Sequence, residues 1–202
     1  MRATRHHFRE SRSAPVFIAL AAVSLLLSGC TRHRRPGPQA QMLDVPHHAQ
    51  QTPTGCGLRT VDMFTDYWNH PLPDAARETL VAEVEPDGVR AITVVNALEA
   101  GGYEAYLLRG TWDPGPTSIH HHLDRGRPLL VQIRNDPRHW VLVVGRDRER
   151  DEIILADPVR DRVAVGSERF AAEWQLAHNL LIVASPPPGT AQPAGDFHDG
   201  TQ

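Results

Sequence analysis

The apolar residues of this chain repeat with two different periods, and the change falls near Pro128. Before Pro128 they recur every three or four residues, the spacing that turns one face of a helix toward a core. After Pro128 they form short β-branched runs separated by turn residues, which is typical of strands. The helical spacing predicts helices over residues 56–68, 74–84, 89–100 and 117–123. The other signals predict strands over 103–108, 129–133, 140–144, 153–156, 162–165 and 180–183, and a last helix over 167–174.

This order, with most helices first and most strands after, predicts an α+β fold whose N-terminal helices pack on a C-terminal antiparallel sheet. We expect one domain over residues 42–184, which is long enough to bury a core of its own. The chain shows no internal repeat.

The N-terminal residues 1–29 have the three parts of a secretory signal peptide: scattered arginines, an apolar run over 14–27 and small residues before the cut. The apolar run is shorter than the roughly 20 residues of a membrane-spanning helix. The motif Leu27-Ser28-Gly29-Cys30 resembles the lipobox of bacterial lipoproteins, whose cysteine becomes the lipidated first residue. Cys30 is therefore the predicted lipidation site; the alternative is an ordinary secretory peptide with a chance cysteine.

Two polar stretches flank the predicted domain. Residues 30–41, rich in Arg, Pro and Gln, predict a flexible tether from the lipidated Cys30. Residues 185–202 open with Ser and three prolines and predict a disordered tail. Thr31 stands where inner-membrane lipoproteins of Gram-negative bacteria carry a retention Asp. We therefore expect a lipid-anchored protein of the cell envelope, on the outer membrane and facing the periplasm.

The charge pattern argues against a nucleic-acid partner. The formal net charge is −3, and every basic side chain is Arg, since the sequence contains no Lys. Four of the arginines lie in the predicted signal peptide, so the domain itself is more acidic. An acidic domain with scattered arginines lacks the basic patch that binds nucleic acid.

Cys56 is the cysteine that remains once Cys30 is assigned to the lipid, so it has no intramolecular disulfide partner. Gly55 and Gly57 flank it at the predicted start of the first helix. A helix N-terminus and a neighbouring imidazolium both lower the pKa of a thiol. This setting favours a nucleophile over a small buried side chain, the other common role of a free cysteine.

His139 and Asp157 are the candidate partners of that nucleophile. His139 opens the strand predicted over 140–144, and Asp157 ends the next one, over 153–156. If the two strands are antiparallel neighbours, the two side chains meet, with His139 as general base and Asp157 fixing its tautomer. Each residue alone also suits a common structural role, a histidine at a strand edge and an Asp-Pro turn.

A glutamine side chain is the candidate oxyanion donor. Acyl transfer builds a negative oxygen that an amide N–H beside the nucleophile stabilises. Gln50 precedes Cys56 on a predicted extended segment, and Gln51 is its rival for this role. Either residue also fits a solvated loop.

Zinc is the alternative to a thiol nucleophile, because the chain has twelve histidines, including two runs of adjacent histidines within the predicted domain. His47-His48 and His120-His121-His122 form these runs. Adjacent residues of a helix point in different directions, so such a run does not supply three convergent ligands to one ion. We therefore predict no metal site and no cofactor.

The ordered set of Gln, Cys, His and Asp resembles the papain-like superfamily, and most closely the compact peptidases that cleave double-glycine leaders from bacteriocins. The likeness covers nearly the whole predicted domain, in the segments 44–46, 55–57, 126–131, 139–145 and 156–158 and in Phe170 and Trp174. It implies a papain-like fold and a peptide or protein substrate. It also implies that Cys56 is the nucleophile, His139 the base, Asp157 the orienting acid and Gln50 the oxyanion donor.

The sequence departs from that family after the cysteine. The family usually has Pro-Ala after Cys-Gly, whereas Leu58-Arg59 follows here. The expected location also differs from that of the leader-cleaving enzymes, so double-glycine specificity is not carried over. Two further readings stay open: an amidase or acyltransferase of transglutaminase type with the same triad, and a surface-tethered binding module without turnover.

Overall fold

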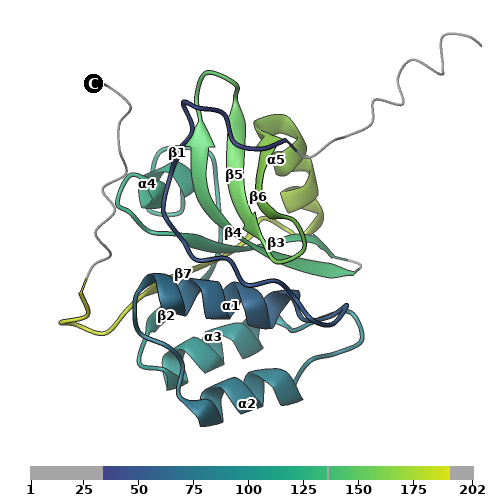
Figure 1. Cartoon of the computed structure of the whole chain (residues 1–202), viewed down its shortest axis with the longest axis vertical. Coiled ribbons are helices and arrows are strands. Elements are labelled where there is room, and N and C mark those ends of the chain that lie inside the picture. The colour runs from purple at the N-terminus through teal and green to yellow at the C-terminus, as the bar shows by residue number, and fades with distance from the viewer. Residues whose placement is uncertain (1–33, 136, 192–202) are drawn as a thin grey trace, which may run out of the picture. The chain divides into compact units, whose positions relative to one another are not determined.

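The computed structural model describes residues 34–135 and 137–191, with the side chain of residue 135 left out. The predicted signal peptide, its lipidation site Cys30 and residues 192–202 of the predicted tail lie outside the described residues. After the short strand β1 (Gln41–Met42), three helices come in the order that the sequence predicts (Figure 1). They are α1 (Cys56–Tyr67), α2 (Asp74–Ala82) and α3 (Ala91–Ala100).

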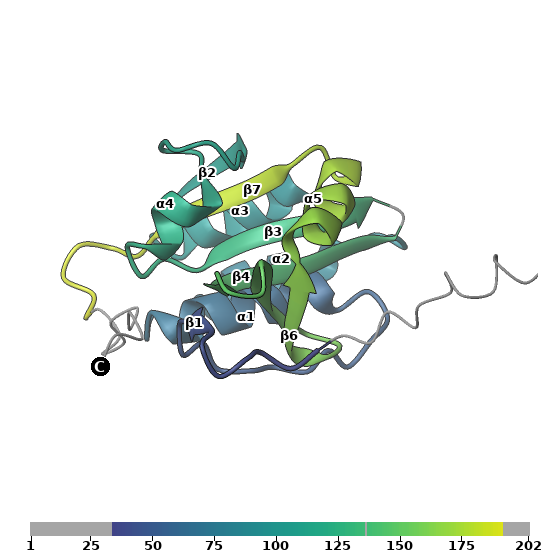
Figure 2. The ribbon, with the colours of Figure 1, turned by 90° about the horizontal axis from the view of Figure 1, so that it is seen from above.

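A seven-stranded sheet follows, with all its neighbouring strands antiparallel. Its order is β2-β7-β3-β4-β5-β6, and β1 pairs with β4 beside that path. Figure 2 shows β2, β7, β3 and β4 side by side in this order. The strands are β1 (Gln41–Met42), β2 (Glu104–Arg109), β3 (Leu129–Asn135), β4 (Arg138–Asp147), β5 (Glu152–Asp157), β6 (Asp161–Gly166) and β7 (Leu180–Ser185).

Helices cover both faces of the sheet, and each face has its own core. Figure 1 shows α1, α2 and α3 together on one side and α5 (Ser167–Leu176) on the other, where α4 (Ile119–Leu123) also packs. Along β4, Trp140 and Leu142 face the first three helices, whereas Val141 and Val143 face the core under α4 and α5. Since both faces of β4 are buried, its sequence reads as one continuous apolar run.

The predicted α+β class and the antiparallel sheet are confirmed, and the differences lie at element ends. The helix predicted over 117–123 is the shorter α4, because residues 111 and 118 form an isolated bridge before it. The third helix begins at Ala91 rather than residue 89, because Glu85 and Gly88 close a turn with backbone hydrogen bonds. Such ends depend on tertiary contacts that a local pattern does not contain.

The ordered part of the chain begins earlier than residue 42. The Ala164 N–H donates to the Arg34 carbonyl at 2.8 Å, and β1 begins at Gln41. Within the segment predicted as a tether, Arg34 and Gln41 thus pair with strands of the sheet. The reason is that β4 extends past β3, whose Leu129 pairs with Val143, and β1 takes up the side of β4 that β3 leaves.

Glycine allows β1 to approach β4 closely. A Cβ atom at Gly145 would lie 2.3 Å from the carbonyl oxygen of Gln41, which real Cβ atoms do not approach. At the other end of the domain, β7 ends at Ser185, one residue beyond the predicted boundary. Within residues 34–135 and 137–191, no helix combines the length and apolar character needed to cross a membrane.

Candidate active site

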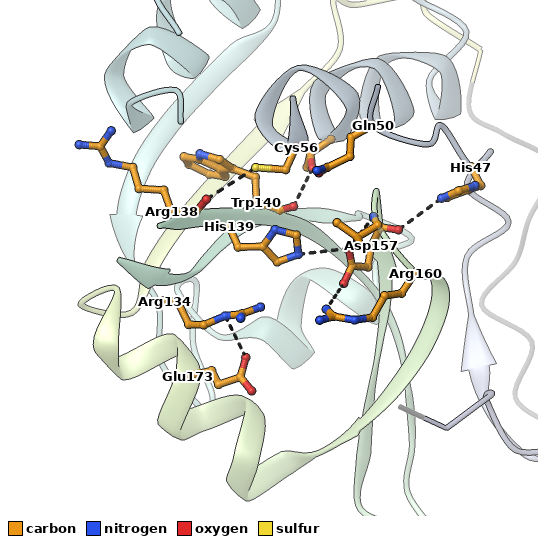
Figure 3. A network of polar contacts seen from close by, with 12 residues as sticks. His47, Gln50, Cys56, Arg134, Arg138, His139, Trp140, Asp157, Arg160 and Glu173 are labelled. Atoms are coloured by element: carbon orange, nitrogen blue, oxygen red, sulfur yellow. Dashed lines mark hydrogen bonds and ion pairs between the residues drawn. The ribbon is translucent and has the colours of Figure 1, made fainter. Parts of the chain in front are cut away.

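A cavity of about 190 Å³ lies where α1 begins and where β4 and β5 reach the edge of the sheet. Gln50, Cys56 and His139 line it, and Asp157 contacts His139 from behind (Figure 3). The structure thus brings together four residues that the sequence singled out, from segments up to about a hundred positions apart. Only Cys30, the predicted lipidation site, lies outside the described residues.

Cys56 is the first residue of α1, and its side chain is buried. The turn before it is held by a hydrogen bond from the Gly55 N–H to the Thr52 carbonyl, at 3.1 Å. The first N–H groups of a helix have no partner inside the helix, so they favour negative charge at this position. The thiol donates a long hydrogen bond to the Arg138 carbonyl, with Sγ and O 3.7 Å apart.

Glycine at position 57 lets the start of α1 lie against the core. A Cβ atom there would lie 2.1 Å from Cγ1 of Val89 and 3.2 Å from Cδ1 of Trp140. Trp140 is held in turn by a hydrogen bond from its indole N–H to the Val89 carbonyl, at 3.0 Å. Gly57 therefore sets the depth at which Cys56 sits beside β4.

The surroundings of Cys56 favour its ionised form. Burial raises the pKa of the thiol, but hydrogen bonding and charge from His139 act in the opposite direction. The backbone N–H groups of Trp140 and Gly57 also stabilise the thiolate. The net result is a pKa below the ordinary value of 9.0. His139 and the backbone N–H groups thus favour the thiolate form of Cys56 over what burial alone would allow.

His139 is the second residue of β4, and its ring is nearly buried. Its Nε2 lies 3.1 Å from Oδ1 of Asp157, so Nε2 carries the hydrogen that this carboxylate accepts and Nδ1 is left for the thiol. Burial lowers the pKa of His139, but the hydrogen bonds and charges of Asp157 and Cys56 raise it to about 9. The imidazole therefore remains protonated at neutral pH when the thiolate is present.

Asp157 is the last residue of β5, and its side chain is 1% exposed. Its Oδ1 also accepts the N–H of Val159 at 2.8 Å, and its Oδ2 accepts Nη1 of Arg160 at 3.0 Å. Burial raises the pKa of this carboxyl, but the hydrogen bond and charge of His139, with Val159 and Arg160, lower it to about 2. Asp157 is thus a fixed negative charge behind the imidazole.

The structure separates the two candidate glutamines. Gln50 lines the cavity, and its backbone N–H donates to the Pro158 carbonyl at 2.9 Å, which ties it to the turn after Asp157. Its side-chain Nε2 has only a weak contact of 3.5 Å with the Pro53 carbonyl. Gln51 is exposed and does not line the cavity. Gln50 is therefore the glutamine positioned beside Cys56.

Two arginines that the sequence did not single out hold this site in place. Arg160 bonds Asp157, and Arg138 donates from Nη1 to carboxylate oxygens of Glu85 and Asp87, both at 2.9 Å. The contacts of Arg138 with Glu85 and Asp87 fix the first residue of β4 to the turn before α3. The backbone carbonyl of this residue accepts the hydrogen bond of the Cys56 thiol. The pairs of Arg138 join segments some fifty positions apart and leave no periodic signal in the sequence, whereas Arg160 lies three residues after Asp157.

The histidines of the runs 47–48 and 120–122 lie in separate environments. His48 contacts Asp66 at 2.7 Å, whereas the ring of His122 contacts the Pro116 carbonyl at 2.8 Å. His47 contacts the backbone carbonyl of Asp157 at 3.3 Å and belongs to the surroundings of the site. In the part of the chain that the structure describes, no group of three or more His, Cys, Asp or Glu side chains is arranged to hold a metal ion.

The domain has an α+β fold, and a cysteine at a helix N-terminus lies near a histidine and an aspartate on adjacent antiparallel strands. This arrangement defines the papain-like class of cysteine peptidase domains. Residues 42–182 match the Peptidase_C39 like family, and the chain belongs to that family. No curated protein matches the chain.

Solved structures show the same fold. The peptidase domain of Streptococcus ComA, a bi-functional ABC transporter involved in quorum sensing, is 19% identical, with a TM-score of 0.54 over 72% of this chain and 98% of that one. A double glycine motif protease from an AMS/PCAT transporter, solved in complex with the leader peptide, is 18% identical, with a TM-score of 0.55 over 76% and 99%. A C39-like peptidase from Bacillus anthracis is 16% identical, with a TM-score of 0.57 over 72% and 97%.

Proposed function

We propose that this protein is a cysteine peptidase that hydrolyses peptide bonds with Cys56 as nucleophile. The observation that carries the proposal is that Cys56 and His139 line the same cavity, while Asp157 contacts the His139 ring at 3.1 Å and His139 lowers the pKa of the thiol. Family membership and the leader peptide bound to a protein of similar fold support a peptide substrate.

The proposed reaction gives each of the four residues a separate role. The Cys56 thiolate attacks the carbonyl carbon, and the oxygen gains negative charge between the side-chain amide of Gln50 and the backbone N–H of Cys56. The imidazolium of His139 gives its proton to the leaving amine as the C–N bond breaks, and a thioester remains. Water then attacks the thioester while His139 takes its proton, which releases the acid and restores the thiolate. Asp157 keeps the ring oriented throughout.

We further propose that the protein is anchored in the cell envelope through lipidated Cys30, on the outer membrane and facing the periplasm. The lipobox-like motif before Cys30 supports this location. In this arrangement the substrate is a peptide or protein of the periplasm.

The proposal is tested by comparing peptide termini in periplasmic extracts of strains carrying the wild-type protein and Cys56→Ala. We expect a set of termini that depends on Cys56, since alanine has no nucleophile. A Cys30→Ala arm is expected to move the protein from the membrane fraction to the soluble fraction. Identical termini in the two strains, with a normally folded variant, would contradict peptidase activity; Cys30→Ala protein that stays in the membrane fraction would contradict the lipid anchor.

The role of Gln50 gives a separate prediction with a matched control. Gln50→Ala is expected to lower kcat by about 10²–10³-fold, because one oxyanion donor is lost. Gln51→Ala, which changes an exposed neighbour outside the cavity, is expected to change kcat by less than about threefold. Steady-state kinetics on one cleaved peptide, with unfolding temperatures of both variants, make the comparison. Equal effects of the two substitutions would exclude a specific role for Gln50.

A further inference from the structure

The hairpin between β3 and β4 contains an irregular residue beside the catalytic histidine. Ile133 pairs with His139, and the register shifts between Ile133 and Asn135. The residue within the shift, Arg134, has a φ of 55°, in the left-handed region that few residues other than glycine adopt. Such bulges re-aim a side chain and are common next to active sites. The irregularity places Arg134 in the lining of the Cys56 cavity.

Arg134 differs from the other two arginines of this cavity in its partners. Arg138 donates to Glu85 and Asp87, and Arg160 donates to Asp157, all within 3.0 Å. The contact of Arg134 with Glu173 is longer, with Nε and Oε2 3.6 Å apart, and another oxygen of Glu173 accepts Nε of Arg169 at 3.0 Å.

Among the described residues, Glu173 is the ion-pair partner of Arg134, so most N–H groups of this guanidinium are available to a ligand there. Its side chain is 41% exposed, and Figure 3 shows it on the side of the His139 ring away from Cys56. A guanidinium presents its N–H groups in a planar fork that matches a carboxylate. Among the described residues, the only acidic side chain that lines the same cavity is Asp87, and it is bonded to Arg138.

The position of Arg134 relative to His139 indicates which part of a substrate it meets. In the proposed reaction His139 protonates the leaving amine, so the residue after the cleaved bond passes along the imidazole. Gln50, which would hold the carbonyl oxygen together with the backbone N–H of Cys56, lies on the other side of Cys56 from Arg134 (Figure 3). Arg134 is thus adjacent to the leaving-group side.

We propose that Arg134 is a specificity residue that binds a carboxylate on the leaving-group side of the cleaved bond. The carboxylate belongs either to an acidic side chain just after that bond or to the free C-terminus of a short leaving group. This inference rests on the proposed function and adds a substrate class to it: peptides with negative charge immediately after the cleavage point.

Alkylation of Cys56 tests the carboxylate site without any turnover. Iodoacetate and iodoacetamide react with the same thiolate, but only iodoacetate carries a carboxylate, so the ratio of the two rates reports binding of that group near Cys56. Arg134→Gln is expected to lower this ratio by about two- to fivefold, the effect of one partly exposed ion pair. Arg109→Gln, which changes an exposed arginine on β2, serves as the control and should leave the ratio unchanged. An unchanged ratio in Arg134→Gln would overturn the proposal.

Peptide cleavage then distinguishes the two sources of the carboxylate. One set of peptides carries Asp or Asn just after the cleaved bond, and a second set ends there in a free or an amidated C-terminus. For the set that supplies the carboxylate, we expect Arg134→Gln to lower kcat/KM about five- to tenfold, chiefly through KM, and to leave the neutral peptide unaffected. Equal loss on charged and neutral peptides would overturn the specificity role. If no peptide is cleaved, the proposed function fails, and the alkylation ratio still decides whether Arg134 binds a carboxylate.

Discussion

Replacing His139 with alanine is expected to lower kcat/KM for a cleaved peptide by at least about 10⁴-fold, as loss of a triad member does in related chemistry. Two functions disappear together. The Cys56 thiol loses the hydrogen bond and positive charge that oppose the effect of burial, so its pKa rises. The leaving amine also loses its proton donor, because Asp157 lies behind the imidazole rather than beside the thiol.

Steady-state kinetics with His48→Ala as control isolate this effect. His48 is bonded to Asp66 and does not line the cavity, so its removal should leave kcat/KM within about threefold of the wild-type value. Unfolding temperatures of both variants show whether the fold is intact. A folded His139→Ala protein that retains a tenth of the wild-type activity would contradict the proposed role of His139.

Replacing Asp157 with alanine is expected to lower kcat/KM by about 10⁴-fold, the order of loss seen when the third member of a triad is removed. The pKa of His139 is raised to about 9 by the hydrogen bonds and charges of Asp157 and Cys56, so removal of this carboxylate lowers it. The imidazolium that protonates the leaving amine then loses its proton at a lower pH, and the alkaline side of the pH–rate profile moves down from about 9.

Asp157→Asn is the matched control for that change. An asparagine side-chain oxygen still accepts from Nε2 of His139 and from the Val159 N–H, so the ring keeps its orientation, whereas the charge and the hydrogen bond from Arg160 are lost. Asparagine holds this position in papain-like proteases, so we expect a loss of only about ten- to a hundredfold. Equal losses for Ala and Asn would show that the charge, rather than the orientation of the ring, carries the effect. An alkaline limb that stays at about 9 in Asp157→Ala would contradict the electrostatic account.

The sequence predicted the parts of the fold and site that have local signals. Helical spacing after Gly55, short β-branched runs and their order were enough for the α+β class and for an antiparallel sheet. His139 and Asp157 stand at corresponding ends of adjacent strands, so the prediction of antiparallel pairing also predicted their contact.

The sequence could not predict features that depend on where distant strands stop. The pairing of β1 with β4 arises because β3 begins at Leu129, opposite Val143, and leaves the last residues of β4 without a partner on that side, which no local pattern shows. The bulge at Arg134 and the clamp on Arg138 likewise depend on a one-residue shift and on a loop some fifty positions away. The choice between Gln50 and Gln51 required the hydrogen bond that fixes Gln50 to Pro158. These features position the side chains of the candidate site, but they leave no recognisable motif in the sequence.

The pH dependence of Cys56 alkylation by iodoacetamide tests the central claim most directly, because it measures the thiolate itself. In the wild-type protein we expect alkylation to remain fast at neutral pH, with an acid limb below the ordinary thiol pKa of 9.0. In His139→Ala the same limb should move to higher pH, because the imidazolium no longer offsets the effect of burial. A wild-type thiol that becomes reactive only above pH 9.0, with no difference between the two proteins, would contradict the thiolate–imidazolium pair on which the proposed function depends.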